Sequence, residues 1–320
     1  MKPGLVALCV ICGMIMFLGF WYILFSQFFG NLFSAVSGMD SNAYMESGVY
    51  GDTIDVFYVE GTIAEGSTTY QHTWTLNQID HLMESESNKG IILYVNSPGG
   101  GIYESDELYL KIKEYKETTG RPVYAYMAQT AASGGLYVSM AADEIYANRM
   151  TMTGSIGVIM STTDTTGLQE LIGIKEENIT SGPNKAMGNP LTDEQRAILQ
   201  SMVDESYDIF VEIIAENRNL DDNKVREIAD GRIYSARQAK ELGLIDEIAS
   251  YEETVQNFID TYKLEDCTIY HQRPPLSALE ELLLSVETDL ESSKVTESFT
   301  AIHNYIEANK SPKIMYYMGH

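Results

Sequence analysis

Histidine, cysteine and basic residues are all scarce in this 320-residue chain. It has five histidines and three cysteines, and its 21 Lys and Arg against 46 Asp and Glu give a formal net charge of −25. This charge argues against a protein that mainly holds nucleic acid, because phosphate binding depends on Lys and Arg. Cys9 and Cys12 lie in an apolar N-terminal segment, so Cys267 stands alone downstream. A disulfide scaffold and a cysteine-based zinc site within one chain are therefore excluded, and we expect no metal and no cofactor.

Charged residues are absent from the segment Leu5–Phe25. As a helix this run would reach about 31 Å, which is the thickness of one hydrocarbon core. Trp21 and Tyr22 lie near its end, where amphipathic rings favour the headgroup zone. No Lys or Arg follows the run until Lys89. The positive-inside rule therefore places the N-terminus in the cytoplasm and the rest of the chain outside it.

These features predict a single-pass anchor in membrane lipid over residues 1–29, followed by a linker over 30–52. A cleaved signal peptide is the alternative, because Ala35 and Ser37 have the small-residue spacing of a cleavage site. The apolar run is longer than the core of a usual signal peptide, and this favours the anchor.

Strand-like and helix-like segments alternate from residue 53 to about 265, with short turns between them. This alternation favours an α/β fold with a largely parallel sheet. We expect strands at 54–59, 90–96, 122–127 and 144–147, helices at 72–87, 103–117, 131–142 and 192–217, and an extended piece followed by a helix within 230–249.

The last part of the chain, residues 266–320, is expected to be a helical extension. Pro274 and Pro275 interrupt the chain there, and apolar residues then recur at alternating spacings of three and four, at positions 276, 279, 283, 286 and 290. Such a stripe suits a helix that packs on its own domain or one that contacts a second subunit.

Several common catalytic signatures are missing. No histidine occurs between His81 and His271, so a Ser-His-Asp site built from the core is poorly supported. Neither an HExxH zinc motif nor a P-loop is present. The glycines at 99–101 resemble a dinucleotide-binding turn, but Glu104 stands where the third glycine belongs and would repel a pyrophosphate.

Ser133 lies among small residues, in the segment Thr130–Gly135. If a strand passes into a helix there, the N–H of Gly134 and the helix N-terminus would favour an oxyanion. Close packing is the simpler explanation of a serine in such a segment. Without a histidine, a serine needs a neutral lysine as its base. Lys185 has no charged residue within four positions, which suits that role, although an exposed loop lysine would look the same.

Five segments together resemble the protease IV family of bacterial signal peptide peptidases. They are VNSPGGG at 95–101, ASGGLYVSMAAD at 132–143, TGSIGVI at 153–159, SGPNKAMGNP at 181–190 and ADGRIYSARQAKELGLIDEI at 229–248. They occur in the order of the family, and the resemblance extends from about residue 54 to 255.

The resemblance implies a ClpP/crotonase-like fold over residues 53–265 and a Ser-Lys dyad. It implies that Ser133 is the nucleophile and Lys185 the general base, and that Ser155 hydrogen-bonds the lysine. It also implies that the N–H groups of Gly100 and Gly134 form the oxyanion hole. No residue of these motifs departs from the pattern of the family.

The function implied by the resemblance is that of a membrane-anchored serine endopeptidase. Such an enzyme degrades remnant signal peptides and other peptides at the extracytoplasmic face of the cell membrane. The family also implies a homo-oligomeric ring with sites completed between neighbouring subunits. Two alternatives are an acyl-CoA enzyme of the crotonase superfamily and a catalytically silent membrane scaffold.

Overall fold

The computed structural model describes residues 51–274 of the 320-residue chain. The expected membrane anchor, nearly all of the expected linker and the apolar stripe of the C-terminal extension lie outside these residues. Among the residues described, none of the helices is long and apolar enough to cross a bilayer.

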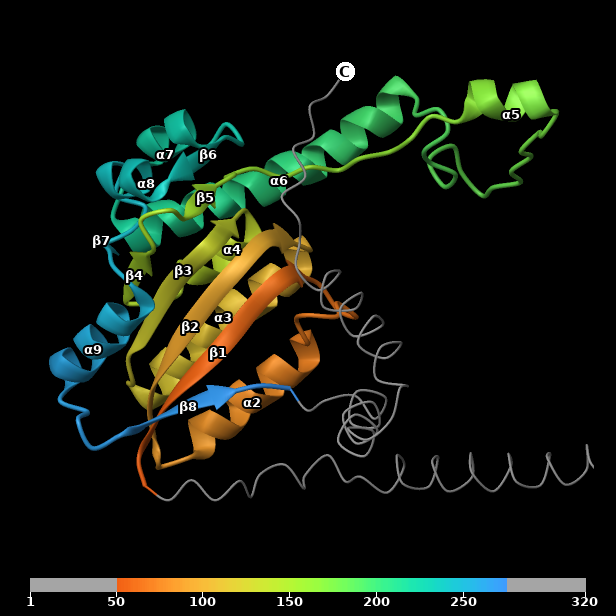
Figure 1. The fold of residues 1–320 in the computed structure, drawn as a ribbon. Coiled ribbons are helices and arrows are strands. Elements are labelled where there is room, and N and C mark those ends of the chain that lie inside the picture. Colours follow the sequence, from red (N-terminus) through yellow and green to blue (C-terminus); the bar gives the residue numbers. More distant parts are fainter. Residues whose placement is uncertain (1–50, 275–320) are drawn as a thin grey trace, which may run out of the picture. The chain divides into compact units, whose positions relative to one another are not determined.

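One mixed sheet forms the centre of the described chain (Figure 1). Its strands follow the order β6-β5-β3-β2-β1-β8, with β4 paired to β3 and β7 paired to β4. Every pairing printed for these strands is parallel except that of β5 with β6. This confirms the α/β class, and a central sheet of this kind fits a ClpP-like fold. The strands are β1 (Thr53–Ile63), β2 (Asn88–Gly100), β3 (Val123–Ala132), β4 (Glu144–Ala147), β5 (Met152–Gly154), β6 (Ile233–Ser235), β7 (Glu247–Ile248) and β8 (Thr268–Gln272).

The sheet continues past the expected domain end at residue 265. Strand β8 pairs with β1 in parallel, with Thr268 beside Thr53 and Gln272 beside Phe57. Residues 268–272 were expected in the helical extension, and they are an edge strand instead. Gln272 donates from Nε2 to the Asp55 carboxylate at 2.7 Å, which ties this strand to the buried polar group at the start of β1.

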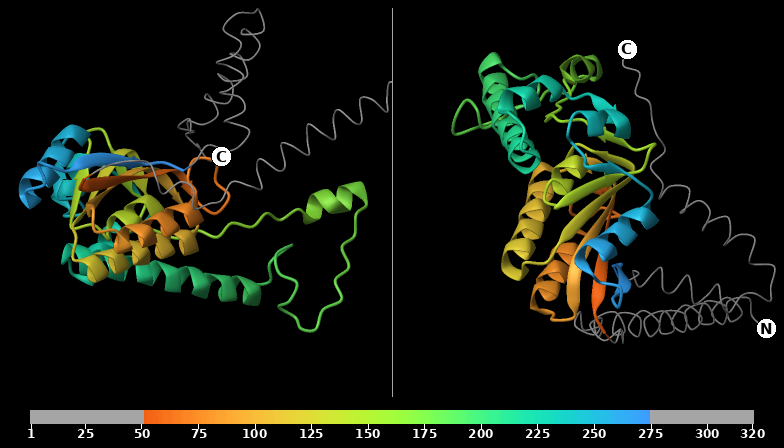
Figure 2. Two further views of the ribbon diagram at one scale, coloured as in Figure 1. Left: turned by 90° about the horizontal axis from the view of Figure 1, so that it is seen from below. Right: turned by 90° about the vertical axis from the view of Figure 1, so that its left-hand side faces the viewer.

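Helices lie on both faces of the sheet (Figure 2). They are α2 (His72–Glu84), α3 (Ile102–Thr119), α4 (Gly134–Ser139), α5 (Thr166–Ile172), α6 (Asp193–Arg218), α7 (Asp222–Ile228), α8 (Ala236–Glu241) and α9 (Tyr251–Tyr262). Helix α4 is shorter than the helix expected over 131–142, because Ala131 and Ala132 continue β3 and pair with β5.

Alternate strand residues supply two separate cores, because successive side chains of a strand point to opposite faces. On one face Phe57 and Leu93 belong to the core formed with α2, α3, α4 and α6. On the other face Ile54 and Ile92 pack in a second core with Phe258 of α9. The unbroken apolar run of β2 is thus explained by burial on both sides.

Helix α6 is buried along only part of its length. It begins at a capping box between Thr192 and Gln195. Most of its buried residues lie between Phe210 and Ala215, whereas Ile198 and Met202, on the expected apolar face, are exposed. The first half of α6 therefore extends beyond the core.

Candidate active site

Ser133 lies at a sharp turn between β3 and α4. Its backbone angles, φ 52° and ψ −120°, are unusual for a residue with a side chain. Its N–H donates to the carbonyl oxygen of Gly154 at 2.8 Å, and its own carbonyl accepts from Tyr137 N–H at 2.9 Å. A strained turn from a strand into a helix is the geometry that presents a nucleophilic serine.

Glycines surround this turn because side chains would not fit. A Cβ on Gly134 would lie 2.4 Å from Ser105 Oγ, and a Cβ on Gly99 would lie 2.8 Å from the nitrogen of Gly134. The end of β2 and the start of α4 thus touch through bare backbone. This brings Gly100 and Gly134, the two expected oxyanion donors, beside Ser133.

The nitrogen of Gly100 lies close to Gly134. Gly101 N–H donates to the carbonyl oxygen of Ile63 on β1 at 2.8 Å. Successive N–H groups of a strand point to opposite sides, so the N–H of Gly100 faces β3, away from β1. The nitrogen of Gly100 lies 3.3 Å from where a Cβ of Gly134 would be. Two backbone donors from different elements therefore converge next to Ser133.

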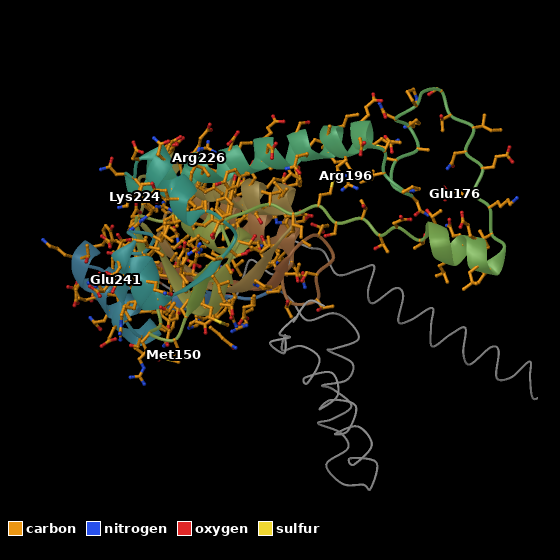
Figure 3. The ribbon with its side chains drawn as sticks, turned by 90° about the horizontal axis from the view of Figure 1, so that it is seen from above. Met150, Glu176, Arg196, Lys224, Arg226 and Glu241 are labelled. Carbon is orange, nitrogen blue, oxygen red and sulfur yellow. The ribbon has the colours of Figure 1, made fainter. Side chains whose placement is uncertain are left out.

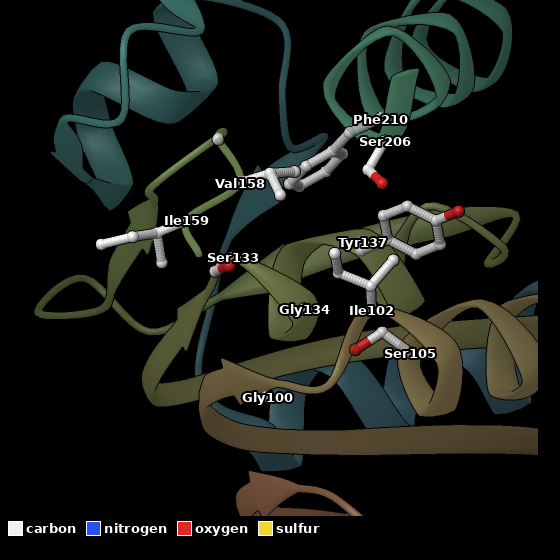
Figure 4. Close-up of a pocket in the computed structure, with 11 residues that line it drawn as sticks. Gly100, Ile102, Ser105, Ser133, Gly134, Tyr137, Val158, Ile159, Ser206 and Phe210 are labelled. Atoms are coloured by element: carbon white, nitrogen blue, oxygen red, sulfur yellow. The ribbon is translucent and has the colours of Figure 1, made fainter. Parts of the chain in front are cut away.

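A pocket opens beside these groups (Figure 4). Its apolar side chains come from four parts of the chain: the start of α3, helix α4, the segment after β5, and helix α6. The lining residues are Gly100, Ile102, Ser105, Ser133, Gly134, Tyr137, Gly157, Val158, Ile159, Ser206 and Phe210. A mainly apolar pocket with a few polar groups at one side suits a side chain of a bound peptide.

Tyr137 forms one wall of the pocket and is held as a neutral phenol. Its hydroxyl donates to Asp106 Oδ1 at 2.6 Å, and its ring contacts those of Tyr109 and Phe210. Burial raises the pKa of Tyr137, and its hydrogen bond to Asp106 raises it further. The fixed ring therefore gives the pocket a rigid apolar wall.

Ser155 follows the strand that pairs with the end of β3. Gly154 is the register partner of Ala132, so Ser155 and Ser133 occupy neighbouring backbone positions. Ser155 also has a positive φ of 51°, and its N–H donates to the carbonyl oxygen of Arg232 at 2.7 Å. Its place beside Ser133 is compatible with the expected contact to a lysine.

Lys185 lies apart from these groups, on the exposed loop between α5 and α6, and does not line the pocket. Gln195 Nε2 donates to the carbonyl oxygens of Pro183 and Ala186, at 3.3 and 3.1 Å. These bonds fix the loop to the first turn of α6, about 16 Å along the helix axis from Ser206 of the pocket. The described chain by itself therefore does not bring Lys185 to Ser133.

The segment that carries Lys185 projects beyond the sheet. Figure 3 shows it with Glu176 on the loop and Arg196 in the first turn of α6. We call residues 159–209 the arm. It exposes many large apolar side chains, among them Ile159 at 84% and Leu171 at 82%. The other exposed ones are Met160, Leu168, Ile172, Ile174, Ile179, Met187, Ile198, Met202 and Ile209.

The sequence did not indicate the residues whose apolar side chains line the pocket. Ile102 directly follows the glycine-rich turn, and Tyr137 lies one helical turn after Ser133, so their spacing to the motifs could have indicated them. Phe210 is distant in sequence, and only the packing of α6 on α4 brings it to the pocket.

Comparisons with known proteins place these residues in context. The sequence profile of peptidase family S49 matches residues 115–265. A protein of Enterococcus faecium named as a signal peptide peptidase SppA is 35% identical over 288 residues, covering 86% of this chain and 83% of that protein. A Synechocystis protein named as a protease is 34% identical over 242 residues, covering 73% of this chain and 87% of that protein.

A more distantly similar protein is matched over a smaller share of its own length. Protease 4 of Haemophilus influenzae is 33% identical over 207 residues, which are 63% of this chain and 34% of that protein. The profile match includes both Ser133 and Lys185, whereas Gly100 precedes it.

Proposed function

Because this chain belongs to peptidase family S49 and is a serine peptidase, we propose that it uses Ser133 as nucleophile and Lys185 as general base to cleave signal peptides. The observation that carries this proposal is the position of Ser133. It lies at a strained strand-to-helix turn, beside two backbone donors and at the wall of an apolar pocket.

The proposed reaction needs only groups of the protein and water. Neutral Lys185 takes the proton of the Ser133 hydroxyl, and the oxygen attacks the peptide carbonyl. The N–H groups of Gly100 and Gly134 bind the oxyanion, each donor being worth about 2.7–4 kcal/mol. The lysine ammonium then protonates the leaving amine, and water hydrolyses the acyl-enzyme. Ser155 orients the lysine by a hydrogen bond.

The substrate class follows from the relatives and from the pocket. One relative of this chain is named as a signal peptide peptidase, and signal peptides have an apolar core. Ile102, Tyr137, Val158 and Phe210 give the pocket an apolar lining next to Ser133. We therefore propose that an apolar side chain next to the scissile bond occupies this pocket.

We further propose that neighbouring copies complete the site in a homo-oligomeric ring. The loop with Lys185 is fixed to the outer end of α6, away from the Ser133 of its own chain. The arm on which it lies exposes apolar side chains such as Leu171 and Ile179, and a partner would bury them. Docking of one arm on a second copy would bury this apolar surface. The same docking would bring Lys185 to the Ser133 of that second copy.

The location of the enzyme is proposed from the sequence. Residues 5–25 would hold the chain in the cell membrane with its N-terminus in the cytoplasm. The peptidase domain would then work at the extracytoplasmic face, close to the peptides that signal peptidases release.

Replacement of either dyad residue tests the proposal. Ser133→Ala and Lys185→Ala should each lower hydrolysis of a synthetic signal peptide by at least about 10³-fold, because the nucleophile or its base is lost. Lys175→Ala is the matched control, since Lys175 is also an exposed lysine of the arm, and it should keep normal activity. Turnover retained by the Ser133→Ala or Lys185→Ala protein would refute the assignment.

Mixing the two inactive proteins tests the shared site. If Lys185 acts on the Ser133 of another copy, subunit exchange between Ser133→Ala and Lys185→Ala proteins creates sites with both residues intact. Activity should return as exchange proceeds, whereas a mixture that stays inactive despite proven exchange would place both residues in one chain.

A further inference from the structure

Ser97 is a fully buried serine in the turn that leads to Gly100, and the proposed reaction does not use it. Its side chain has 0% exposure. Its Oγ accepts a hydrogen bond from the N–H of Gly99 at 3.0 Å and lies 3.4 Å from the carbonyl oxygen of the same residue. The N–H of Gly99 belongs to the peptide unit between Pro98 and Gly99, whereas the carbonyl of Gly99 belongs to the same peptide unit as the N–H of Gly100. The hydroxyl therefore contacts both peptide units that flank Gly99.

The pairing of β2 with β1 is irregular at this point. Glu60 pairs with Asn96 and Thr62 with Gly99, so β2 has one residue more than β1 between the two pairs. Pro98 lies within this bulge and has no N–H to donate. A bulge interrupts the ladder and changes the direction of backbone groups. The N–H of Gly99, at a buried position, donates to the Ser97 hydroxyl within this bulge.

Hydrogen bonds hold the chain on both sides of the N–H of Gly100, because the Ser97 hydroxyl also donates to the carbonyl oxygen of Gly99, which shares a peptide unit with that N–H. The Ser97 hydroxyl accepts from the N–H of Gly99, and the carbonyl of Ile63 accepts from the N–H of Gly101. Gly99 has a positive φ of 103°, a conformation that glycine adopts readily. Gly99 has no side chain to restrict its rotation, so the contacts of the Ser97 hydroxyl help to fix the peptide unit that carries the N–H of Gly100.

We propose that Ser97 is a positioning residue that aims the N–H of Gly100 at the oxyanion. This inference rests on the proposed function, because it assumes that Gly100 is an oxyanion donor. Loss of the hydroxyl removes its bonds to both the N–H and the carbonyl of Gly99, and buried polar groups are destabilised when they lose such partners. The turn then rotates to find another partner and carries the N–H of Gly100 out of line.

The test compares substrate turnover with binding of a transition-state mimic. A peptide aldehyde adds to a serine hydroxyl and places its oxygen in the oxyanion hole. In Ser97→Ala, kcat should fall about 10- to 100-fold. This fall is no larger than the one expected when a whole oxyanion donor is removed. KM should change by no more than about 2-fold, and the inhibition constant of the aldehyde should rise in parallel with the fall in kcat.

Ser139→Ala is the matched control. Ser139 is also 0% exposed, and its hydroxyl donates to the carbonyl oxygen of Gly135 at 2.8 Å within α4. This variant removes a buried hydroxyl without touching the turn, so it should leave both kcat and the affinity for the aldehyde unchanged. If the loss in Ser97→Ala came only from loosened packing, Ser139→Ala would show a similar loss of kcat and of aldehyde affinity.

The outcomes separate this inference from the proposed function. A folded Ser97→Ala protein with normal kcat and normal aldehyde affinity overturns the inference. If this variant fails to fold, Ser97→Cys replaces it, because a thiol is a weaker acceptor at the same place. Folded Ser97→Cys should show a smaller loss in both quantities, and normal values there would also overturn the inference. Turnover by Ser133→Ala would refute the proposed function instead.

Discussion

Four non-glycine residues of the described chain have a positive φ, and two of them are the serines of the site. Asn219 and Lys263 are C-caps of α6 and α9, where a left-handed residue commonly ends a helix. Ser133 and Ser155 cap no helix C-terminus, and such strain costs about 1–3 kcal/mol per residue. The bonds of their N–H groups to Gly154 and Arg232 hold them in place. Strain retained at these two positions fits a catalytic role.

Gly134→Ala tests the close contact around the oxyanion hole. The new methyl would lie 2.4 Å from Ser105 Oγ and 3.3 Å from the nitrogen of Gly100. We expect a loss of about 1–3 kcal/mol in the free energy of unfolding, because the site is overpacked. We also expect kcat to fall about 100-fold, because a displaced donor no longer binds the oxyanion. Denaturant unfolding and steady-state kinetics measure the two effects.

The double variant Gly134→Ala/Ser105→Ala separates the effect on stability from the effect on kcat. It removes the hydroxyl that the methyl meets first and keeps the methyl beside Gly100. Stability should largely return while kcat stays low. Recovery of kcat together with stability would show that Gly134 matters for packing alone.

Helix α6 connects the core to the arm. Its second half is fixed in the core by residues such as Phe210 and Ile214, while its first half and α5 expose apolar side chains. A helix that is apolar where no other described part of its chain covers it points to a partner. Elements of the arm are therefore where assembly should be most sensitive to substitution.

Leu171→Glu tests the arm as a contact between copies. Leu171 is 82% exposed, so the change should not unfold the chain. A buried leucine contributes about 1.5–3 kcal/mol, and a charge in its place opposes docking. Light scattering should show smaller particles, and peptide hydrolysis should fall at least about 10-fold. Thr163→Glu puts the same charge on an exposed polar position of the arm and should change neither. A Leu171→Glu protein with unchanged size and activity would contradict this use of the arm.

At the scale of the whole molecule, local patterns in the sequence predicted part of the architecture. The alternation of apolar strands and amphipathic helices correctly indicated the α/β class, and β4 and α6 lie almost where expected. Strand β8 was missed because its residues form no apolar run, and its place depends on pairing with β1, far away in sequence. Long-range pairing of this kind leaves little local signal.

The candidate site, like the fold, could be predicted only in part from the sequence. The small residues around Ser133 and the glycines at 99–101 are consequences of close backbone contact, and they are visible in the sequence. The pocket wall formed by Tyr137 and Phe210 depends on how α4 and α6 pack. The relation of Lys185 to Ser133 depends on the placement of the arm, which motif order cannot give.

The central claim is that Ser133 is the nucleophile of this peptidase, and covalent labelling tests it most directly. The assembled full-length protein is treated with a peptidyl fluorophosphonate, and the modified residue is located by mass spectrometry of proteolytic fragments. The account predicts one adduct per chain, on Ser133, with none in the Ser133→Ala protein and slowed labelling in Lys185→Ala. An adduct on another serine, or equal labelling of the Ser133→Ala protein, would contradict it.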